Sequence, residues 1–260
     1  MPKPKSTQYN KTKRLNLFLK LLIGLLTIII IAMLGLVIWG MNPSQPDARA
    51  IAATQTDDRV SVIEEANRLQ FLPANGSPST GLIFYPGGHV DYRAYAPLLR
   101  EISASGYAVY LVKMPLSLAV LGVNRANEII AAHPEVEYWF IGGHSLGGSM
   151  AAAYIYSNPV SMEGLVLWAA YPAESNDLSK SGFPVLSIFG NQDGLVTLEE
   201  LKASALLLPT NTTWVEIDGG NHAQFGSYGS QRGDLEASIP AKDQQLQIVN
   251  ATIMFLSGIQ

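Results

Sequence analysis

The feature that most restricts the fold of this chain is a run of glycines around one serine. Gly143-His144-Ser145-Leu146-Gly147 follows the apolar run Tyr138–Ile141 and leads into the small, helix-forming run Gly147–Ser157. A serine on a tight strand-to-helix turn has a strained backbone, and the residues two positions away must be small enough to clear the strand and the helix. The pattern predicts that Ser145 is exposed where a strand ends, with a helix N-terminus directed at the site.

Around this turn, apolar runs alternate between strand-like and helix-like patterns. The runs LVLWAA and VLSIF are apolar throughout, as expected for parallel strands buried on both faces. The alternation predicts an α/β domain with a mostly parallel central sheet and helices on both faces. The expected strands are Val60–Glu65 and Arg68–Leu72, paired antiparallel, then Gly81–Tyr85, Tyr107–Val112, Tyr138–Ile141, Gly164–Ala170, Pro184–Phe189 and Thr213–Ile217. The expected helices are Tyr92–Ala104, Asn124–Ala132, Gly147–Ser157, Thr197–Leu207 and Lys242–Leu256.

Several motifs carry a resemblance to a known family. YWFIGGHSLGGSMAAAYI resembles the nucleophile elbow of the α/β-hydrolase superfamily. The stretches FYPGGHVDYRAYAPLLR, GNQDG and GGNHAQFG resemble a small branch without a lid, near the dienelactone-hydrolase-like and carboxylesterase-like enzymes. The resemblance extends from about residue 60 to about residue 258. It implies the α/β-hydrolase fold without a lid domain, whereas the substrate stays open because this superfamily supports many reactions.

The histidine of a serine triad can be found by elimination. The superfamily order is serine, then aspartate or glutamate, then histidine. His89 and His133 precede the serine, and His144 is its neighbour and would point away around the turn. His222 alone follows the serine, in GGNHA after the last expected strand. We therefore expect His222 to take the serine proton and later to protonate the leaving group.

The acid that orients this histidine is expected to be Asp193. It ends the motif GNQD directly after the expected strand Pro184–Phe189. Its carboxylate would hold the imidazole in one tautomer and stabilise its charged form. Alternatives are Asp177, Glu174 and Asp218, of which Asp218 could instead brace the loop that bears the histidine.

An acyl-transfer site also needs backbone N–H donors for an oxyanion. The first expected donor is Leu146, the residue after the nucleophile. The second is expected from the Pro-Gly-Gly turn after Gly81–Tyr85, with Gly88 favoured and His89 as the alternative. Tyr171, after the sixth expected strand, is a candidate for the substrate pocket.

The segment where related enzymes often insert a helical lid is short. Only 14 residues run from Tyr171 to Pro184. We therefore expect an open site that accepts bulky or surface-bound substrates without a closing step.

Residues 21–41 form an uncharged apolar run, LLIGLLTIIIIAMLGLVIWGM. As a helix they would span about 31 Å, which matches the hydrocarbon core of a bilayer. An excess of basic residues before the run predicts a cytoplasmic N-terminus and an extracytoplasmic remainder. These residues are Lys3, Lys5, Lys11, Lys13, Arg14 and Lys20. The alternative is a cleaved signal peptide, for which the run is long and lacks a good cleavage site after Trp39.

The chain is thus expected to have four parts. Residues 1–20 would form a basic cytoplasmic tail and residues 21–41 a transmembrane signal anchor. Residues 42–57 are polar, small and proline-bearing, which is typical of a linker. Residues 58–260 would form the α/β-hydrolase domain.

Charge and composition argue against several other classes of protein. Residues 1–20 hold six of the 17 basic residues and no acid, so the chain beyond the apolar run has 11 basic and 21 acidic residues, a net charge of −10. Such a domain gives no support to nucleic-acid binding. There is no cysteine, and the four histidines lack metal-ligand spacing, so we expect no disulfide, no metal and no cofactor.

Together these residues predict a serine hydrolase that cleaves a carboxylic ester, or a related acyl bond, through an acyl-enzyme intermediate. The expected partners are a small-molecule or lipid-like ester and a membrane, which the chain would enter through residues 21–41. One alternative is an acyltransferase, in which an acceptor alcohol replaces water. The other is a catalytically idle binding module that keeps the fold.

Overall fold

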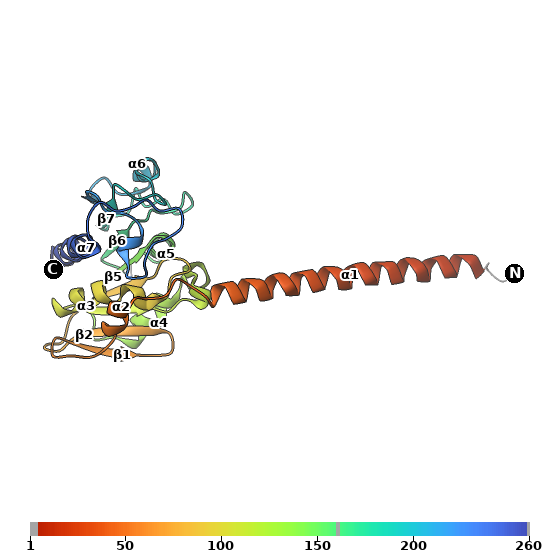
Figure 1. The fold of residues 1–260 in the computed structure, drawn as a ribbon, viewed down its shortest axis with the longest axis horizontal. Coiled ribbons are helices and arrows are strands. Elements are labelled where there is room, and N and C mark those ends of the chain that lie inside the picture. The colour runs from red at the N-terminus through yellow and green to blue at the C-terminus, as the bar shows by residue number, and fades with distance from the viewer. Residues whose placement is uncertain (1–4, 160–161, 259–260) are drawn as a thin grey trace. The chain divides into compact units, whose positions relative to one another are not determined.

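The structure of the chain is a computed structural model, which describes residues 5–159 and 162–258. Residues 1–4, in the expected basic tail, and residues 259–260, at the end of the expected hydrolase domain, lie outside the described residues. Packing divides the chain into two units, residues 1–42 and 43–260, and each is described by itself (Figure 1).

Among its described residues, the first unit consists of one continuous helix, α1 (Lys5–Gly40), followed by a turn at Met41 and Asn42. Within α1, Phe18–Gly40 contains 23 residues with a mean hydropathy of 3.1. This part is long and apolar enough to cross a bilayer, and a signal sequence near the N-terminus would meet the same criteria. The helix ends one residue before the expected end of the span at residue 41.

The second unit is built on one eight-stranded sheet in the order β1-β2-β4-β3-β5-β6-β7-β8. The strands are β1 (Val60–Glu64), β2 (Arg68–Pro73), β3 (Thr80–Tyr85), β4 (Ala108–Val112), β5 (Tyr138–His144), β6 (Gly164–Trp168), β7 (Val185–Gly190) and β8 (Thr213–Ile217). Strand β2 pairs antiparallel with β1 and β4, and the remaining neighbours are parallel. The predicted antiparallel pair and the mostly parallel sheet are both confirmed.

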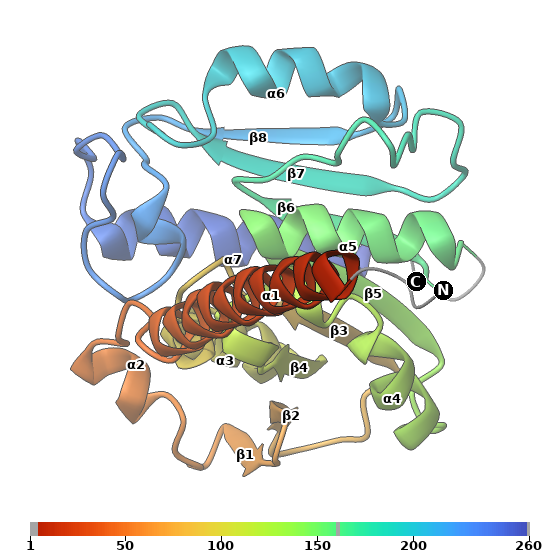
Figure 2. The same cartoon turned by 90° about the vertical axis from the view of Figure 1, so that its right-hand side faces the viewer.

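Helices cover both faces of this sheet. They are α2 (Ala48–Ala52), α3 (Ala96–Ala104), α4 (Arg125–Ala132), α5 (Leu146–Ser157), α6 (Leu198–Ser204) and α7 (Ala241–Ser257). Successive side chains of a strand point to opposite faces. In β3, Leu82 and Phe84 join the core formed with α3 and α7, whereas Ile83 and Tyr85 join the core formed with α4 and α5. These two pairs of helices lie on opposite faces of the sheet (Figure 2). Every residue of β3 is buried, which explains its continuous apolar sequence.

Strand β5 is longer than the sequence predicts, because it continues from Ile141 to His144. Gly142 and Gly143 lower strand propensity, so the pattern alone ends the strand before them. In the fold both residues are paired on each side, with β3 and with β6. The strand therefore delivers the chain directly to Ser145.

One predicted helix, Tyr92–Ala104, begins with a different geometry. Its first turn is the 3₁₀-helix η1 (Tyr92–Tyr95), which the Asp91 carboxylate caps by accepting the N–H of Arg93. The α-helix α3 follows from Ala96, with Pro97 in its first turn, where a residue without an N–H is tolerated.

The expected linker, residues 42–57, contributes to the second unit from Pro43 onward. Ser44 forms a parallel bridge with Val90, and the N–H of Asp47 donates to the Ser227 carbonyl at 2.8 Å. Asp47 also caps α2, in which Ala50 is fully buried. This segment is thus folded onto the domain rather than extended as a free tether.

The connection between β6 and β7 is short, as the sequence predicts. Residues 169–184 are all described and contain no helix or strand. No lid domain is inserted between these two strands.

Candidate active site

Ser145 lies at the turn between β5 and α5, and its backbone conformation is unusual. Its φ of 51° and ψ of −123° lie outside the ordinary regions for a residue with a side chain. The Ser145 N–H donates to the Trp168 carbonyl on β6 at 3.0 Å, which fixes the turn against the sheet. The residue is half-buried, so the turn presents its hydroxyl at the carboxyl end of β5.

The glycines on either side of this turn are required by close backbone contacts. A Cβ atom on Gly147 would collide with the carbonyl oxygens of Tyr85 and Pro86. A Cβ atom on Gly143 would lie 2.6 Å from the same Tyr85 oxygen. Both positions therefore need glycine, for the reason that the spacing of the motif predicts.

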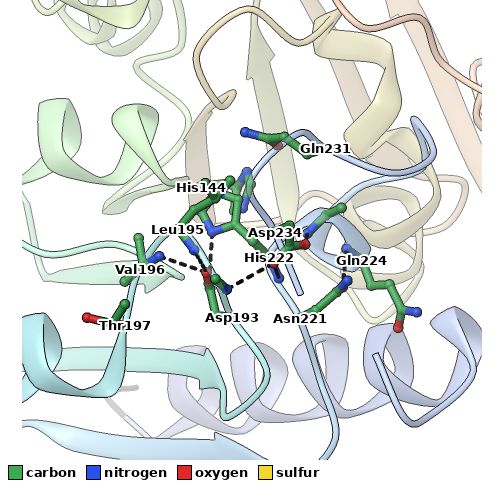
Figure 3. A network of polar contacts seen from close by, with 12 residues as sticks. His144, Asp193, Leu195, Val196, Thr197, Asn221, His222, Gln224, Gln231 and Asp234 are labelled. Carbon is green, nitrogen blue, oxygen red and sulfur yellow. Dashed lines mark hydrogen bonds and ion pairs between the residues drawn. The ribbon is translucent and has the colours of Figure 1, made fainter. Parts of the chain in front are cut away.

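His222 and Asp193 form a buried pair (Figure 3). The His222 Nδ1 atom lies 2.8 Å from Asp193 Oδ2, and the two side chains are 1% and 0% exposed. The other oxygen, Oδ1, accepts the N–H groups of Leu195 at 2.8 Å and Val196 at 2.7 Å. An ionised carboxylate can only accept, so Nδ1 is the donor, and in the neutral imidazole Nε2 is then the acceptor. This is the tautomer that a general base needs.

The elbow brings Ser145 to the neighbourhood of His222. The ring of the adjacent residue, His144, has its centroid 4.4 Å from that of His222. Within the part of the chain that the structure describes, no hydrogen bond joins the Ser145 hydroxyl to the His222 ring. Hydrogen bonds between a nucleophile and its base are often long in free enzymes and tighten when substrate binds.

The other acidic candidates do not contact His222. Asp177 and Glu174 are exposed, and Asp177 accepts the N–H of Ser179 at 2.9 Å. Asp218 is also exposed, and it accepts from the Asn191 side-chain amide at 2.8 Å. Of the four carboxylates that the sequence offered, only Asp193 reaches the imidazole.

A fifth carboxylate, Asp234, was missed by the sequence analysis. Its Oδ1 accepts the N–H of Gly194 at 3.1 Å and of His222 at 3.2 Å, and its Oδ2 accepts the N–H of Ala223 at 2.8 Å. It thus ties the loop of Asp193 to the loop of His222 (Figure 3). No pattern could have found it, because it lies in an irregular loop before α7.

Two backbone donors beside Ser145 have no acceptor among the described residues, namely the N–H groups of Leu146 and Gly88. The two residues are in contact, since a Cβ atom on Gly88 would lie 3.0 Å from Cδ2 of Leu146. The N–H of His89, the alternative donor, is already bonded to the Ser117 carbonyl at 2.8 Å. Of Gly88 and His89, Gly88 therefore has the uncommitted donor.

Comparison with known proteins identifies the fold that holds this site. The model of the Alpha/beta hydrolase family matches residues 81–246, more than half of the chain. The chain belongs to this family. A search of curated protein sequences found no match.

Solved structures of several α/β-hydrolases resemble the chain. A monoacylglycerol lipase from Paleococcus ferrophilus has a TM-score of 0.59 at 14% identity, over 77% of this chain and 100% of that one. The esterase domain of a Rhodothermus marinus protein has a TM-score of 0.58 at 14% identity, over 76% and 98%. A dienelactone hydrolase from Anabaena variabilis has a TM-score of 0.55 at 16% identity, over 77% and 97%. Identities this low support a shared fold and leave the substrate open.

In this α/β-hydrolase, Tyr171 is held by two contacts beyond β6. Its hydroxyl donates to Glu200 on α6 at 3.4 Å, and its carbonyl accepts from the Ser149 hydroxyl on α5 at 2.7 Å. Burial, and then the Glu200 carboxylate, raise the pKa of Tyr171, so its phenol is neutral at pH 7. A role in the substrate pocket stays a prediction.

Proposed function

We propose that this α/β-hydrolase is a serine esterase, with Ser145 as nucleophile, His222 as general base and Asp193 as the acid that orients the base. The observation that carries the proposal is the buried contact of Asp193 with His222 close to a strained serine turn. Membership of the family, and neighbours that are esterases and lipases, support a hydrolase.

In the acylation step, His222 Nε2 takes the proton of the Ser145 hydroxyl while Oγ bonds to the ester carbonyl carbon. The Asp193 carboxylate stabilises the imidazolium that forms. The N–H groups of Gly88 and Leu146 donate to the oxyanion of the tetrahedral intermediate. When this intermediate collapses, the bond to the alcohol oxygen breaks, and the alcohol leaves with the proton from His222.

Deacylation repeats the sequence with water. His222 takes a proton from water as its oxygen bonds to the acyl carbon, and the same two N–H groups bind the second oxyanion. The bond to Ser145 Oγ then breaks, the proton returns to the serine, and the carboxylic acid is released.

The proposed substrate is a small-molecule or lipid-like carboxylic ester. Ser145 is half-buried, and the connection between β6 and β7 has no lid, which supports a site open to bulky acyl groups. Two of the structural neighbours are named as an esterase domain and a monoacylglycerol lipase, and both names denote activity on esters. Rates on p-nitrophenyl esters of rising chain length would define the acyl preference.

The nucleophile is tested with a fluorophosphonate probe, which reacts with activated serines. The wild type should be labelled, and Ser145→Ala should lose both labelling and ester hydrolysis. Ser157→Ala, at the other end of the same helix, is the matched control and should keep both. A wild type that is neither labelled nor active on the ester panel would overturn the proposal.

The proposal includes a single-pass topology, with α1 as the anchor and the hydrolase domain outside the cytoplasm. The basic residues before the apolar run support this orientation. Because the chain has no cysteine, one Ser230→Cys substitution at an exposed site creates a unique label. An impermeant maleimide should modify this variant in intact cells. Modification only after lysis would place the domain on the cytoplasmic side.

A further inference from the structure

His144, the second residue of the elbow motif, is not a solvent-facing neighbour of the nucleophile. It is 1% exposed. Its ring contacts that of His222, at 4.4 Å between centroids, and that of Phe225, which is stacked nearly parallel to it at 5.5 Å. Its Nδ1 atom lies 2.8 Å from the hydroxyl of Tyr95, the fully buried last residue of η1. The residue before Ser145 is therefore linked to a different element of the fold.

The same tyrosine hydroxyl also holds the glycine turn after β3. The N–H of Gly87 donates to the Tyr95 oxygen at 3.0 Å. A backbone N–H can only donate, so the Tyr95 oxygen accepts from Gly87, and the hydroxyl proton is available for His144 Nδ1. The chain of bonds runs from the Gly87 N–H to the Tyr95 hydroxyl and on to the His144 ring. With Tyr95 as the donor to Nδ1, His144 is neutral and carries its proton on Nε2.

The glycine turn fits this pair closely. A Cβ atom on Gly87 would lie 2.6 Å from the Tyr95 oxygen and 2.8 Å from His144 Nδ1. On the other side of Gly88, the N–H of His89 is bonded to the Ser117 carbonyl. The N–H groups on either side, those of Gly87 and His89, are therefore both hydrogen-bonded. The Gly88 N–H between them has no acceptor among the described residues.

We propose that Tyr95 and His144 are positioning residues, which lock the glycine turn to the nucleophile elbow and so aim the Gly88 N–H at the oxyanion. The inference rests on the proposed esterase function. Neither side chain touches the substrate. The elbow carries the first oxyanion donor, Leu146, and the glycine turn carries the second, so a bond between these two segments fixes the distance between the donors.

A neutral His144 also suits its position. Burial, and then the charge of the nearby His222, hold the pKa of His144 well below its usual value. A cationic ring at this place would oppose the imidazolium that forms on His222 during acylation. The groups that face His144 from the packed elements are Tyr95, His222 and Phe225, and none of them is a carboxylate that could stabilise a charge on it.

The test compares two tyrosine-to-phenylalanine variants of the full chain. Tyr95→Phe removes the bond between the glycine turn and His144. It should lower kcat about 10- to 100-fold and leave KM nearly unchanged, because an N–H that no longer points at the oxyanion stabilises mainly the transition state less. Binding of a boronic acid, which forms a tetrahedral adduct with Ser145, should weaken by a similar factor. Tyr154→Phe is the control, because the Tyr154 hydroxyl, on α5, donates to the Asn127 side chain on α4 at 2.6 Å and not to the glycine turn.

Substitutions of His144 provide a rescue experiment. His144→Asn can place an oxygen near the former Nδ1 and accept from Tyr95, so it should keep most of the activity. His144→Leu cannot accept, and it should resemble Tyr95→Phe in kcat and in boronic acid binding. Melting temperatures separate these effects from a general loss of folding.

Three results would overturn the inference, and the measurements distinguish them. If the wild type hydrolyses esters and Tyr95→Phe matches Tyr154→Phe in kcat and in boronic acid binding, the positioning role fails while the esterase stands. If the wild type neither hydrolyses an ester nor reacts with the fluorophosphonate, the function and the positioning role fail together. A change in KM alone would also count against positioning.

Discussion

At the scale of single residues, the carboxylate of Asp193 uses its two oxygens for different tasks. One oxygen binds two backbone N–H groups of its own loop, which fixes the orientation of the carboxylate. The other oxygen binds His222. The position of this carboxylate is therefore set by local backbone geometry.

The substitution Asp193→Asn tests this arrangement. An amide can present its NH₂ group to His222 Nδ1, which would favour the wrong tautomer and lower kcat by about 10⁴-fold, as in other serine triads. Asp177→Asn and Asp218→Asn are matched controls, since both carboxylates are exposed, and they should keep the wild-type rate. Initial rates on a p-nitrophenyl ester measure the effect. If Asp177→Asn or Asp218→Asn lost all activity while Asp193→Asn stayed active, the carboxylate that orients His222 would be that residue instead of Asp193.

His144 gives a prediction about pH and stability. Its pKa is lowered in the folded protein, so the unfolded chain binds a proton below about pH 6.5 that the folded chain does not. Stability from this group is therefore complete above pH 6.5 and falls with pH below it, by up to about 1.4 kcal/mol per pH unit. Urea unfolding of the wild type and of His144→Asn between pH 5 and 8 measures the difference. Parallel curves for the two proteins would contradict the prediction.

At the scale of elements, the sequence predicts those that are defined by apolar pattern. Each of the eight strands was expected within a few residues. The signal was clearest for the buried strands β3, β4, β6 and β7, which have continuous apolar sequences. The tight turns that carry the candidate residues Ser145 and Gly88 also followed from sequence, since glycine spacing reports the backbone geometry directly. These parts of the fold are encoded locally.

What the sequence did not predict depends on contacts between distant segments. Helix α2 is held by backbone bonds and by one buried alanine, which leave no periodic signal. The short 3₁₀-helices η2 (Pro115–Ser117) and η3 (Ala119–Leu121) were also missed, and η2 contains Leu116 and Ser117 with positive φ. The bonds of Asp234 and Tyr95 join loops whose proximity only the folded sheet creates.

Asp234 yields a prediction at this scale, because it joins two loops rather than two side chains. Asp234→Ala would leave the N–H groups of Gly194, His222 and Ala223 without their carboxylate. Hydrogen bonds to a charged group each contribute about 1.5–3 kcal/mol, so the free energy of unfolding should fall by at least about 2 kcal/mol. The value of kcat should fall as well, because the two loops bear Asp193 and His222, the proposed acid and base. Asp218→Ala, on an exposed neighbouring turn, should change neither quantity in urea titrations and rate assays.

At the scale of the whole molecule, the division into units lies at residue 42, not at the start of β1. The segment from Pro43 to Asp57 is attached to the domain at several points. Ser44 accepts the N–H of Asp91 at 3.0 Å and donates to the His89 carbonyl at 2.9 Å. Arg100 forms an ion pair with Asp57 and donates to the Gln55 carbonyl at 2.6 Å. The glycine turn after β3 is thus supported by this segment as well as by Tyr95.

Two truncations test how far the domain extends. A chain that begins at Pro43 keeps every one of these contacts and should match the full chain in kcat and in melting temperature. A chain that begins at Asp58 loses the Ser44 bonds, the buried Ala50 and the partner of Arg100, so its melting temperature should fall by at least about 5 °C. Its kcat should fall too, because the His89 carbonyl loses its bond to Ser44. Equal melting temperatures for the two truncated chains would show that residues 43–57 act only as a linker.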